Sequence, residues 1–245
     1  MKGIVSLIVV LGAWQGAGWA GWLNPHLLPP PTEILQAFRE TAAGGVLLGH
    51  ALASLNRVLT GLFYACLVAL PLGVLAASSR RVRGYLQPLI ELLRPIPPIA
   101  WIPLAVLWFG VRGDRASNFI TFVAAFFPLF LHTFSGVRHI EQLHLNAARS
   151  LGASRRMLLL DVALPSALPF IITGFRISLG FAWMCVIGAE LIASTSGLGY
   201  MIEINRSMLN TANVMCGMIT IGVIGYLMNE GIMLLERRFS WRPLQ

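Results

Sequence analysis

Long apolar segments recur along this chain, and they limit the folds open to it. A helix needs about 20 mostly apolar residues to cross a membrane. Six segments are candidates for membrane-spanning helices: Ile4–Leu23, Ala51–Ala77, Ile99–Gly110 with some preceding residues, Phe119–Phe134, Leu168–Ala193 and Thr211–Leu235. The third is short and broken, and the fourth is marginal in length. We therefore predict an all-α membrane protein with about six transmembrane helices.

The charged residues support this prediction and exclude several functions. They make up 11% of the 245 residues, whereas a soluble domain carries about 25%. Lys2 is the only lysine, and every other basic residue is an arginine. A P-loop needs a lysine after its glycines, so the body of the chain cannot hold ATP in a Walker-type site. The arginines are not gathered in a soluble basic domain, which argues against nucleic-acid binding.

No pattern of metal ligands or catalytic residues stands out. Cys66, Cys185 and Cys216 lie in separate apolar segments and are interpreted as buried free thiols. His139 and His144 share one long loop but, five residues apart, do not stack on one helix face. An integral membrane enzyme would need His, Asp or Glu clustered at one membrane face. We predict no metal site and no enzymatic activity.

The first apolar segment has two interpretations. Lys2, the apolar run after it and the triplet Gly18-Trp19-Ala20 also resemble a secretory signal with its cleavage site. The apolar run continues beyond that triplet, however, and Trp19 and Trp22 suit the aromatic belt of a retained helix. We favour a retained span.

The distribution of positive charge predicts the orientation, because loops rich in Lys and Arg stay in the cytoplasm. One side would carry eleven positive charges: Lys2, Arg80, Arg81, Arg83, Arg138, Arg149, Arg155, Arg156, Arg237, Arg238 and Arg242. The other side would carry four: Arg39, Arg112, Arg115 and Arg206. Both termini and the long loop 136–167 are therefore predicted to be cytoplasmic.

We interpret residues 1–245 as one transmembrane domain. Residues 1–45 would hold the first span and a short outer helix with Thr32 as its N-cap. Residues 46–240 would form the core. Near the outer end of the fifth span, Ser194–Gly199 should break the helix, with a short interfacial helix after it.

The long loop 136–167 has the pattern of a docking surface. Its first part, Glu141–Leu151, has helical character. Apolar residues recur there at intervals close to four and give one stripe: Leu143, Ala147, Ala148 and Leu151. Gly152 then sits where a helix ends in a left-handed residue. The alternative is a packed interfacial turn with no partner.

The second part of the loop predicts another short helix. Ser154 can cap a helix over Arg155–Leu160. Pro165 and Pro169 mark the entry to the next span. Two short helices at an angle, stiffened at both ends, would then lie on the cytoplasmic face.

This loop resembles that of the permeases of binding-protein-dependent ABC importers. Their pattern of Glu-Ala-Ala, three residues, Gly, nine residues and Ile-x-Leu-Pro is matched in spacing by Asn146-Ala147-Ala148, Gly152 and Val162-Ala163-Leu164-Pro165. In that family the loop forms the coupling helix, which fits a groove of the ATPase. The resemblance implies ATPase coupling by Asn146, Ala147, Ala148, Leu151, Gly152, Ala153, Ser154, Leu164 and Pro165. Asn146 in place of Glu removes one charge from that contact.

Other segments resemble the nitrate, sulfonate and taurine subgroup of these permeases: Leu93–Pro103, Leu107–Gly110, Ala148–Ser154, Ala189-Glu190 and Ser196–Tyr200. The resemblance implies a type I ABC importer permease fold with a cytoplasmic coupling helix. The function implied is a permease subunit for a small anion or organic anion of the nitrate, sulfonate, taurine or bicarbonate type. Uncharged vitamin precursors also remain open as substrates. The alternative is an ion-coupled secondary transporter or channel.

The same resemblance implies the partners. A second permease copy, two ATPase subunits and an extracytoplasmic substrate-binding protein would complete a transporter in the bacterial inner membrane. ATP and Mg²⁺ would be held by the ATPase, and this chain would carry no cofactor.

Ionisable residues inside spans are costly and are functional candidates by default. Arg57 lies near the outer end of the second span and Glu190 near the outer end of the fifth, so we predict a structural ion pair between them. Arg176 lies fourteen residues before Glu190, about 21 Å along a helix. Arg176 therefore needs another partner, such as lipid headgroups.

Prolines interrupt the third candidate span. Pro95, Pro97, Pro98 and Pro103 are incompatible with a regular helix over 95–103. Irregular backbone at membrane depth needs protein or a water-filled cavity around it. We place the pathway or its inner gate at Arg94, Pro95, Pro97, Pro98, Arg176 and Glu190. The alternative is an elbow at the inner surface.

Overall fold

The computed structural model describes residues 2–110, 113–140 and 142–239, and in these ranges the chain forms helices and no strand. The first part comprises α1 Lys2–Trp19, α2 Pro31–Ala43, α3 Val46–Ser78, α4 Arg80–Leu93, the 3₁₀ helix η1 Pro98–Trp101, α5 Ile102–Phe109 and α6 Arg115–Arg138. The second comprises α7 Gln142–Ser150, α8 Arg155–Met157, the π-helix η2 Leu158–Ala163, α9 Leu164–Ala193, α10 Leu198–Ser207 and α11 Thr211–Phe239. The all-α prediction is confirmed.

Four helical segments are long and apolar enough to cross a membrane: Val46–Ser78, Arg115–Arg138, Leu158–Ala193 and Thr211–Leu234. They correspond to the second, fourth, fifth and sixth predicted spans. A fifth candidate is made by α4 together with η1 and α5, which are bent by 88° at the break between them. The described residues thus hold four or five spans, where the sequence predicted about six.

The first and third predicted spans need correction. Helix α1 has 18 residues but is not apolar enough to be among the candidate spans, since it contains Lys2, Gln15 and several glycines. The third segment is the second half of a bent pair whose first half, α4, was not predicted. Arg80, Arg81 and Arg83 form the start of α4 and not a loop, since the Ser79 hydroxyl accepts a hydrogen bond from the Val82 N–H and caps the helix.

The short outer helix, predicted over Ile34–Thr41, begins three residues earlier than predicted. Pro31 opens α2, where its fixed φ suits the first helical position, and Pro30 is the N-cap. The prediction of Thr32 as N-cap is therefore wrong. Thr32 instead joins α2 to α1, because its N–H donates to Gln15 Oε1 at 3.1 Å and its hydroxyl accepts from Gln15 Nε2 at 3.3 Å.

Helix α6 packs closely against α3 on one side and α9 on the other. Glycines allow this approach. A Cβ on Gly61 of α3 would lie 2.5 Å from the Thr121 Cβ of α6, and a Cβ on Gly174 of α9 would lie 2.5 Å from the His132 Cβ of α6. Small residues at helix contacts are the usual basis of close packing in membranes.

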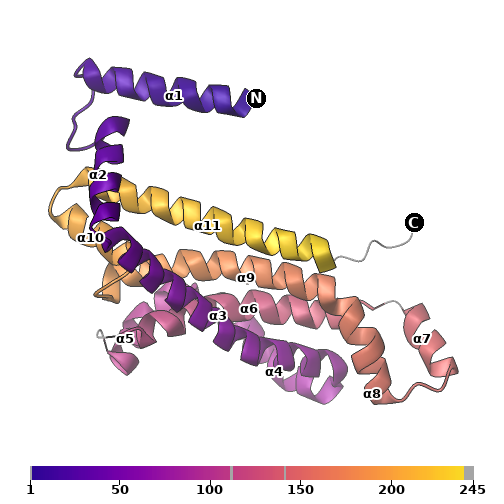
Figure 1. Cartoon of the computed structure of the whole chain (residues 1–245). Coiled ribbons are helices and arrows are strands. Elements are labelled where there is room, and N and C mark those ends of the chain that lie inside the picture. The colour runs from indigo at the N-terminus through magenta and orange to yellow at the C-terminus, as the bar shows by residue number, and fades with distance from the viewer. Residues whose placement is uncertain (1, 111–112, 141, 240–245) are drawn as a thin grey trace.

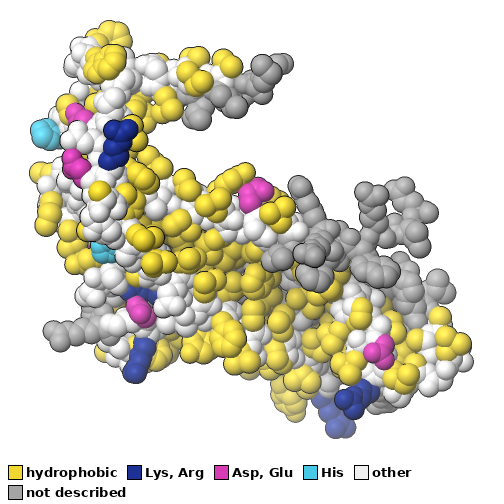
Figure 2. All heavy atoms as spheres, in the orientation of Figure 1, with side chains coloured by type: hydrophobic (Ala, Val, Ile, Leu, Met, Phe, Trp, Pro, Cys, Tyr) yellow, Lys and Arg dark blue, Asp and Glu magenta, His cyan; other side chains and the backbone are white. Residues whose placement is uncertain are grey.

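The bundle has two distinct ends (Figure 1). Helices α3, α6, α9 and α11 run alongside one another, with α2, α5 and α10 at one end and α7 and α8 at the other. The start of α1 and the end of α11 point toward the α7–α8 end. Figure 2 shows that hydrophobic side chains cover most of the face in view, while charged ones gather mainly near the ends. This distribution suits a bundle whose middle is surrounded by lipid.

Candidate functional site

The predicted coupling loop, residues 136–167, contains helix α7, which ends as predicted. After α7, the Gly152 N–H donates to the Arg149 carbonyl at 2.9 Å and the Ala153 N–H to the Ala148 carbonyl at 3.0 Å. Gly152 has a φ of +82°. This pair of bonds around a left-handed residue is the Schellman motif, which satisfies carbonyls at a helix end. The loop therefore turns sharply and rigidly at Gly152.

The second half of the loop differs in part from the prediction. The Ser154 hydroxyl accepts a hydrogen bond from the Met157 N–H at 3.3 Å and caps a helix that begins at Arg155. That helix does not end near Leu160; it widens into the π-helix η2 and continues into α9, where the Leu164 N–H donates to the Leu159 carbonyl. Pro165 lacks the N–H that a regular α-helix would use there, which explains the wider turn.

The tip of the loop presents an apolar side chain to the outside. Leu151 is 89% exposed although it lies among helix ends that have regular hydrogen bonds. Asn146 on α7 accepts a hydrogen bond from Arg149 at 3.3 Å, so the residue that replaces Glu is held within its own helix. Arg112, Glu141 and Arg242 lie outside the described residues, as do the side chains of Leu143 and His144.

Buried polar groups meet near the α2–α10 end of the bundle. Arg57 of α3 is 2% exposed, and its guanidinium lies 2.6 Å from Glu190 of α9 and 2.6 Å from Asp114, which precedes α6. It also donates to the carbonyl and the hydroxyl of Ser196, each at 2.6 Å. The predicted contact between Arg57 and Glu190 is present. It belongs to a larger cluster that joins three parts of the chain.

The Glu190 carboxylate is bonded on both oxygens. The Ser54 hydroxyl lies 2.9 and 2.8 Å from them, and the Gly199 N–H donates to one at 3.0 Å. The Leu198 N–H donates in turn to Ser54 at 2.8 Å. Both buried charges are thus paired and hydrogen-bonded, which is what makes a buried ion pair tolerable.

Sequence reasoning missed Ser54, Asp114 and Ser196 in this cluster. Asp114 gave a usable signal, because it lies on the predicted outer side together with Arg57. Ser54 precedes Arg57 by three residues, which places both on one helix face. Neither sequence position shows which hydrogen-bond acceptor each donor of the cluster contacts.

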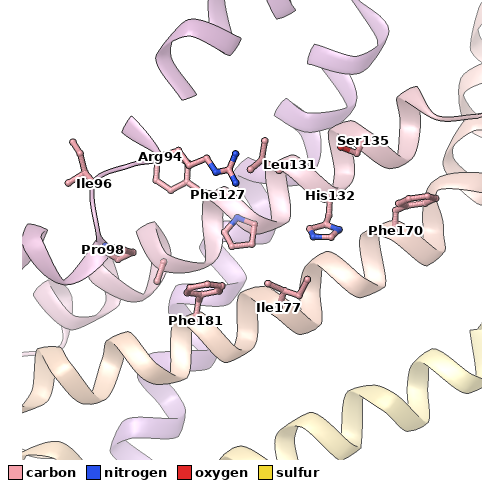
Figure 3. Close-up of a pocket in the computed structure, with 12 residues that line it drawn as sticks. Arg94, Ile96, Pro98, Phe127, Leu131, His132, Ser135, Phe170, Ile177 and Phe181 are labelled. Carbon is pink, nitrogen blue, oxygen red and sulfur yellow. The ribbon is translucent and has the colours of Figure 1, made fainter. Parts of the chain in front are cut away.

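An open cavity of about 590 Å³ lies between the end of α4, α6 and α9 (Figure 3). Arg94 and Pro98, two of the predicted pathway residues, line it together with Ile96, Ala124, Phe127, Pro128, Leu131, His132, Ser135, Phe170, Ile177 and Phe181. Pro95 and Pro97 lie in the break between α4 and η1 that brings Arg94 to the cavity. His132 and Ser135 were not predicted.

Two predicted pathway residues do not line this cavity. Glu190 is held in the buried cluster with Arg57. Arg176 pairs with Glu236 of α11 at 3.3 Å, so its partner is a carboxylate of the same chain and not a headgroup. Arg176 lies beside Gly225 and Met228 of α11, in a separate small pocket. One helix, α9, thus directs Ile177 and Arg176 to different neighbours.

Residues 69–242 match the family of binding-protein-dependent transport system inner membrane components. The chain belongs to this family. The matched range contains the coupling loop, the cavity, Asp114, Glu190 and Ser196, while Arg57 and Ser54 precede it.

This permease is similar to named transport proteins over nearly its whole length. It is 40% identical over 242 residues to the taurine transport system permease protein of Escherichia coli (strain K12), covering 97% of this chain and 88% of that protein. It is 35% identical over 243 residues to the bicarbonate transport system permease protein of Synechococcus elongatus, covering 97% and 87%. The chain is therefore a membrane-embedded transport subunit and not an enzyme.

Solved structures show the same fold. One inward-facing structure of the MetNI methionine ABC transporter has a TM-score of 0.72 at 19% identity, covering 82% of this permease and 99% of that chain. A second has a TM-score of 0.70 at 20% identity, covering 80% and 97%. The predicted type I ABC importer permease fold is confirmed. As the inner-membrane subunit of an ABC importer, the permease works with an ATPase and a substrate-binding protein.

Proposed function

We propose that two copies of this permease form the pathway of an importer for a small anion or organic anion. Two ATPase subunits would bind on the cytoplasmic side and carry the ATP and Mg²⁺, and a binding protein would deliver the substrate outside. The observation that supports this most is the rigid coupling loop with Leu151 89% exposed at its tip. An exposed apolar side chain on a stiff projection suits a groove on a partner protein.

The proposed orientation places the coupling loop and both termini in the cytoplasm of a bacterial cell. The start of α1 and the end of α11 point toward the α7–α8 end (Figure 1). The first turn of α4, with Arg80, Arg81 and Arg83, follows α3 at its far end from α2. Arginine-rich ends of membrane helices stay in the cytoplasm, which agrees with this orientation.

Coupling would follow from the continuity of the loop with α9. Helix α8 passes through η2 into α9 without a flexible break. A movement of the ATPase against Leu151 would therefore be passed to α9, which lines the cavity through Phe170, Ile177 and Phe181. The Arg57 cluster would hold the opposite end of α9 to α3 and to Asp114, at the end where a binding protein would dock.

Reconstituted transport tests this function. The permease and its cognate ATPase, in liposomes with the binding protein, should accumulate tritiated taurine against a gradient only when ATP is supplied on the coupling-loop side. In a background without the three native cysteines, cysteines at Ala148 or Ser154 should crosslink to the ATPase, with yields that change between the nucleotide-free and ATP-bound states. A cysteine at the exposed Arg39 of α2 should not crosslink to the ATPase. Uphill transport by the permease alone would overturn the proposal in favour of a secondary transporter.

A further inference from the structure

One face of α3 holds the outer strap, Ser194–Gly199, which joins α9 to the first turn of α10. His50, Ser54 and Arg57 lie at positions i, i+4 and i+7 of α3 and therefore share one face of this helix. Ser54 and Arg57 bond to the strap within the buried cluster. His50 adds a third attachment, because its Nδ1 accepts a hydrogen bond from the Gly197 N–H at 3.1 Å.

The bond from Gly197 requires an unprotonated nitrogen on His50. A backbone N–H can only donate, so Nδ1 must be the acceptor and the neutral ring carries its proton on Nε2. In a protonated imidazole both nitrogens are donors. Protonation of His50 would therefore remove the acceptor and set two N–H groups against each other. Of the three side chains on this face of α3, only the histidine changes its charge between pH 5 and 8.

The groups around the strap offer no carboxylate to a protonated His50. Those that carry charge are Arg57 of α3, Glu190 of α9 and Asp114 before α6, and both carboxylates are bonded to Arg57. On α10, the Tyr200 ring lies 6.0 Å from the His50 ring. In the described ranges no carboxylate lies within ion-pair distance of His50. A proton taken up there would add a second cation to the face of α3 that already holds Arg57.

Gly197 is also the residue that closes the strap over the buried ion pair. Its φ is +107°, a conformation that favours glycine, and a Cβ built on it would overlap the Glu190 carboxylate. The N–H that His50 accepts thus belongs to the point where the strap passes directly over Glu190. Without this bond, that point would be held only through the residues on either side of it.

We propose that His50 is a pH-sensitive latch for the outer strap, closed when the ring is neutral and released when it is protonated. His50 lies in the second turn of α3, is only partly buried, and belongs to the α2–α10 end of the bundle (Figure 1). The proposed orientation places this end outside the cell, where external protons reach it. A released strap loosens the outer end of α9, so acid outside the cell lowers uptake. This effect on uptake rests on the proposed function, whereas the latch itself does not.

Hydrogen–deuterium exchange tests the latch without transport. The permease–ATPase complex in nanodiscs is labelled at pH 7.5 and pH 5.5, and the peptic fragment with the outer strap is followed by mass spectrometry. Dividing the chemical exchange rate at each pH by the observed rate gives a protection factor. This factor should be about tenfold lower at pH 5.5, because a hydrogen bond is lost and its donor is left unpaired.

Matched variants assign the effect to one ring nitrogen. His50→Asn should keep the protection at both pH values, because the Asn Oδ1 replaces Nδ1 as acceptor and does not titrate. His50→Leu has no acceptor and should show low protection at both. His26→Asn, which removes an exposed histidine just before α2, should behave like the unaltered permease. Equal protection at both pH values in the unaltered permease would overturn the latch, and so would a pH dependence that persists in His50→Asn.

Uptake tests the consequence of the latch. ATP-driven uptake of tritiated taurine into liposomes is measured while only the side opposite the coupling loop is acidified. Uptake at pH 5.5 should fall severalfold in the unaltered permease and in His26→Asn, but not in His50→Asn. Identical pH profiles for the unaltered permease and His50→Asn would overturn the effect on uptake. Absence of uptake from every variant at both pH values would refute the proposed function, and the exchange measurement would still decide the latch.

Discussion

Arg57 shows how one buried side chain ties distant parts of the chain together. Its guanidinium reaches Glu190 of α9, Asp114 before α6 and Ser196 in the break before α10. Such a charge is tolerable only while its partners remain, because a stranded buried charge costs far more than the intact pair contributes.

Removing either member of the pair should therefore destabilise the permease strongly. Arg57→Ala and Glu190→Ala should each cost about 3–5 kcal/mol, and the double variant should cost less than the two together. The charge swap should recover only part of the loss, since Asp114 and Ser196 favour a cation at position 57. The stability lost or recovered in each variant is measured by thermal unfolding of the purified permease. Glu203→Ala, which breaks the exposed Glu203–Arg206 pair of α10, is the control and should leave the midpoint unchanged; purely additive losses would exclude the pair.

The turn after α7 in the coupling loop depends on the left-handed backbone of one residue, Gly152. Its φ of +82° is unfavourable for a residue with a side chain, and no other atom lies within 4 Å of a Cβ built there. A substitution thus acts through the backbone alone.

Gly152→Val should cost roughly 1 kcal/mol or more locally and reorient α7. We expect the complex to stay in the membrane but lose substrate-stimulated ATP hydrolysis, measured on liposomes. Gly152→Asn should keep most of the stimulation, because Asn tolerates the left-handed conformation. Full stimulation in the Val variant would show that the turn is not needed for coupling.

Among the helices, the contact between α6 and α9 positions the cavity. His132 lies on the cavity wall because Gly174 of α9 lets α6 approach closely at that point. Gly180 also lies on α9, and a Cβ added there would meet no atom within 4 Å.

Gly174→Ala should therefore lower stability by about 1–3 kcal/mol, since the methyl group overlaps the His132 Cβ and the helices must separate. The thermal midpoint of the purified complex measures the loss. Gly180→Ala adds the same methyl group to the same helix and should not destabilise it. Equal midpoints for the two variants would contradict the close contact.

For the whole molecule, the cavity between α4, α6 and α9 is open in the single chain, and the proposed pathway would be incomplete without a partner. One chain provides α4, α6 and α9 on its sides and leaves the remainder uncovered. A second copy would close it in the proposed assembly of two permeases and two ATPases.

Native mass spectrometry of the complex should show two permease copies of 26.7 kDa and two ATPase subunits. The permease purified alone should not hydrolyse ATP, since the body of the chain has no lysine for a P-loop. A complex with one copy of this chain and one different permease would replace the homodimer by a heterodimer.

The sequence by itself determined the features that depend on neighbours along the chain. Apolar length predicted four of the spans, the position of Gly152 after α7 predicted its left-handed turn, and the prolines around Pro97 predicted the break after α4. Each follows from local backbone chemistry or from the length of an apolar run.

Only the tertiary structure decided which side chains meet. Arg176 and Ile177 are adjacent, yet Arg176 pairs with Glu236 of α11 while Ile177 lines the cavity. Arg94 and His132 share that cavity because Gly174 lets α6 approach α9 closely, which no local pattern shows. The break after α4 is visible in the prolines, but the prolines do not show which helix Arg94 then meets. Residues far apart in the chain are brought together by the faces on which the helices pack, and those faces are set by the whole bundle.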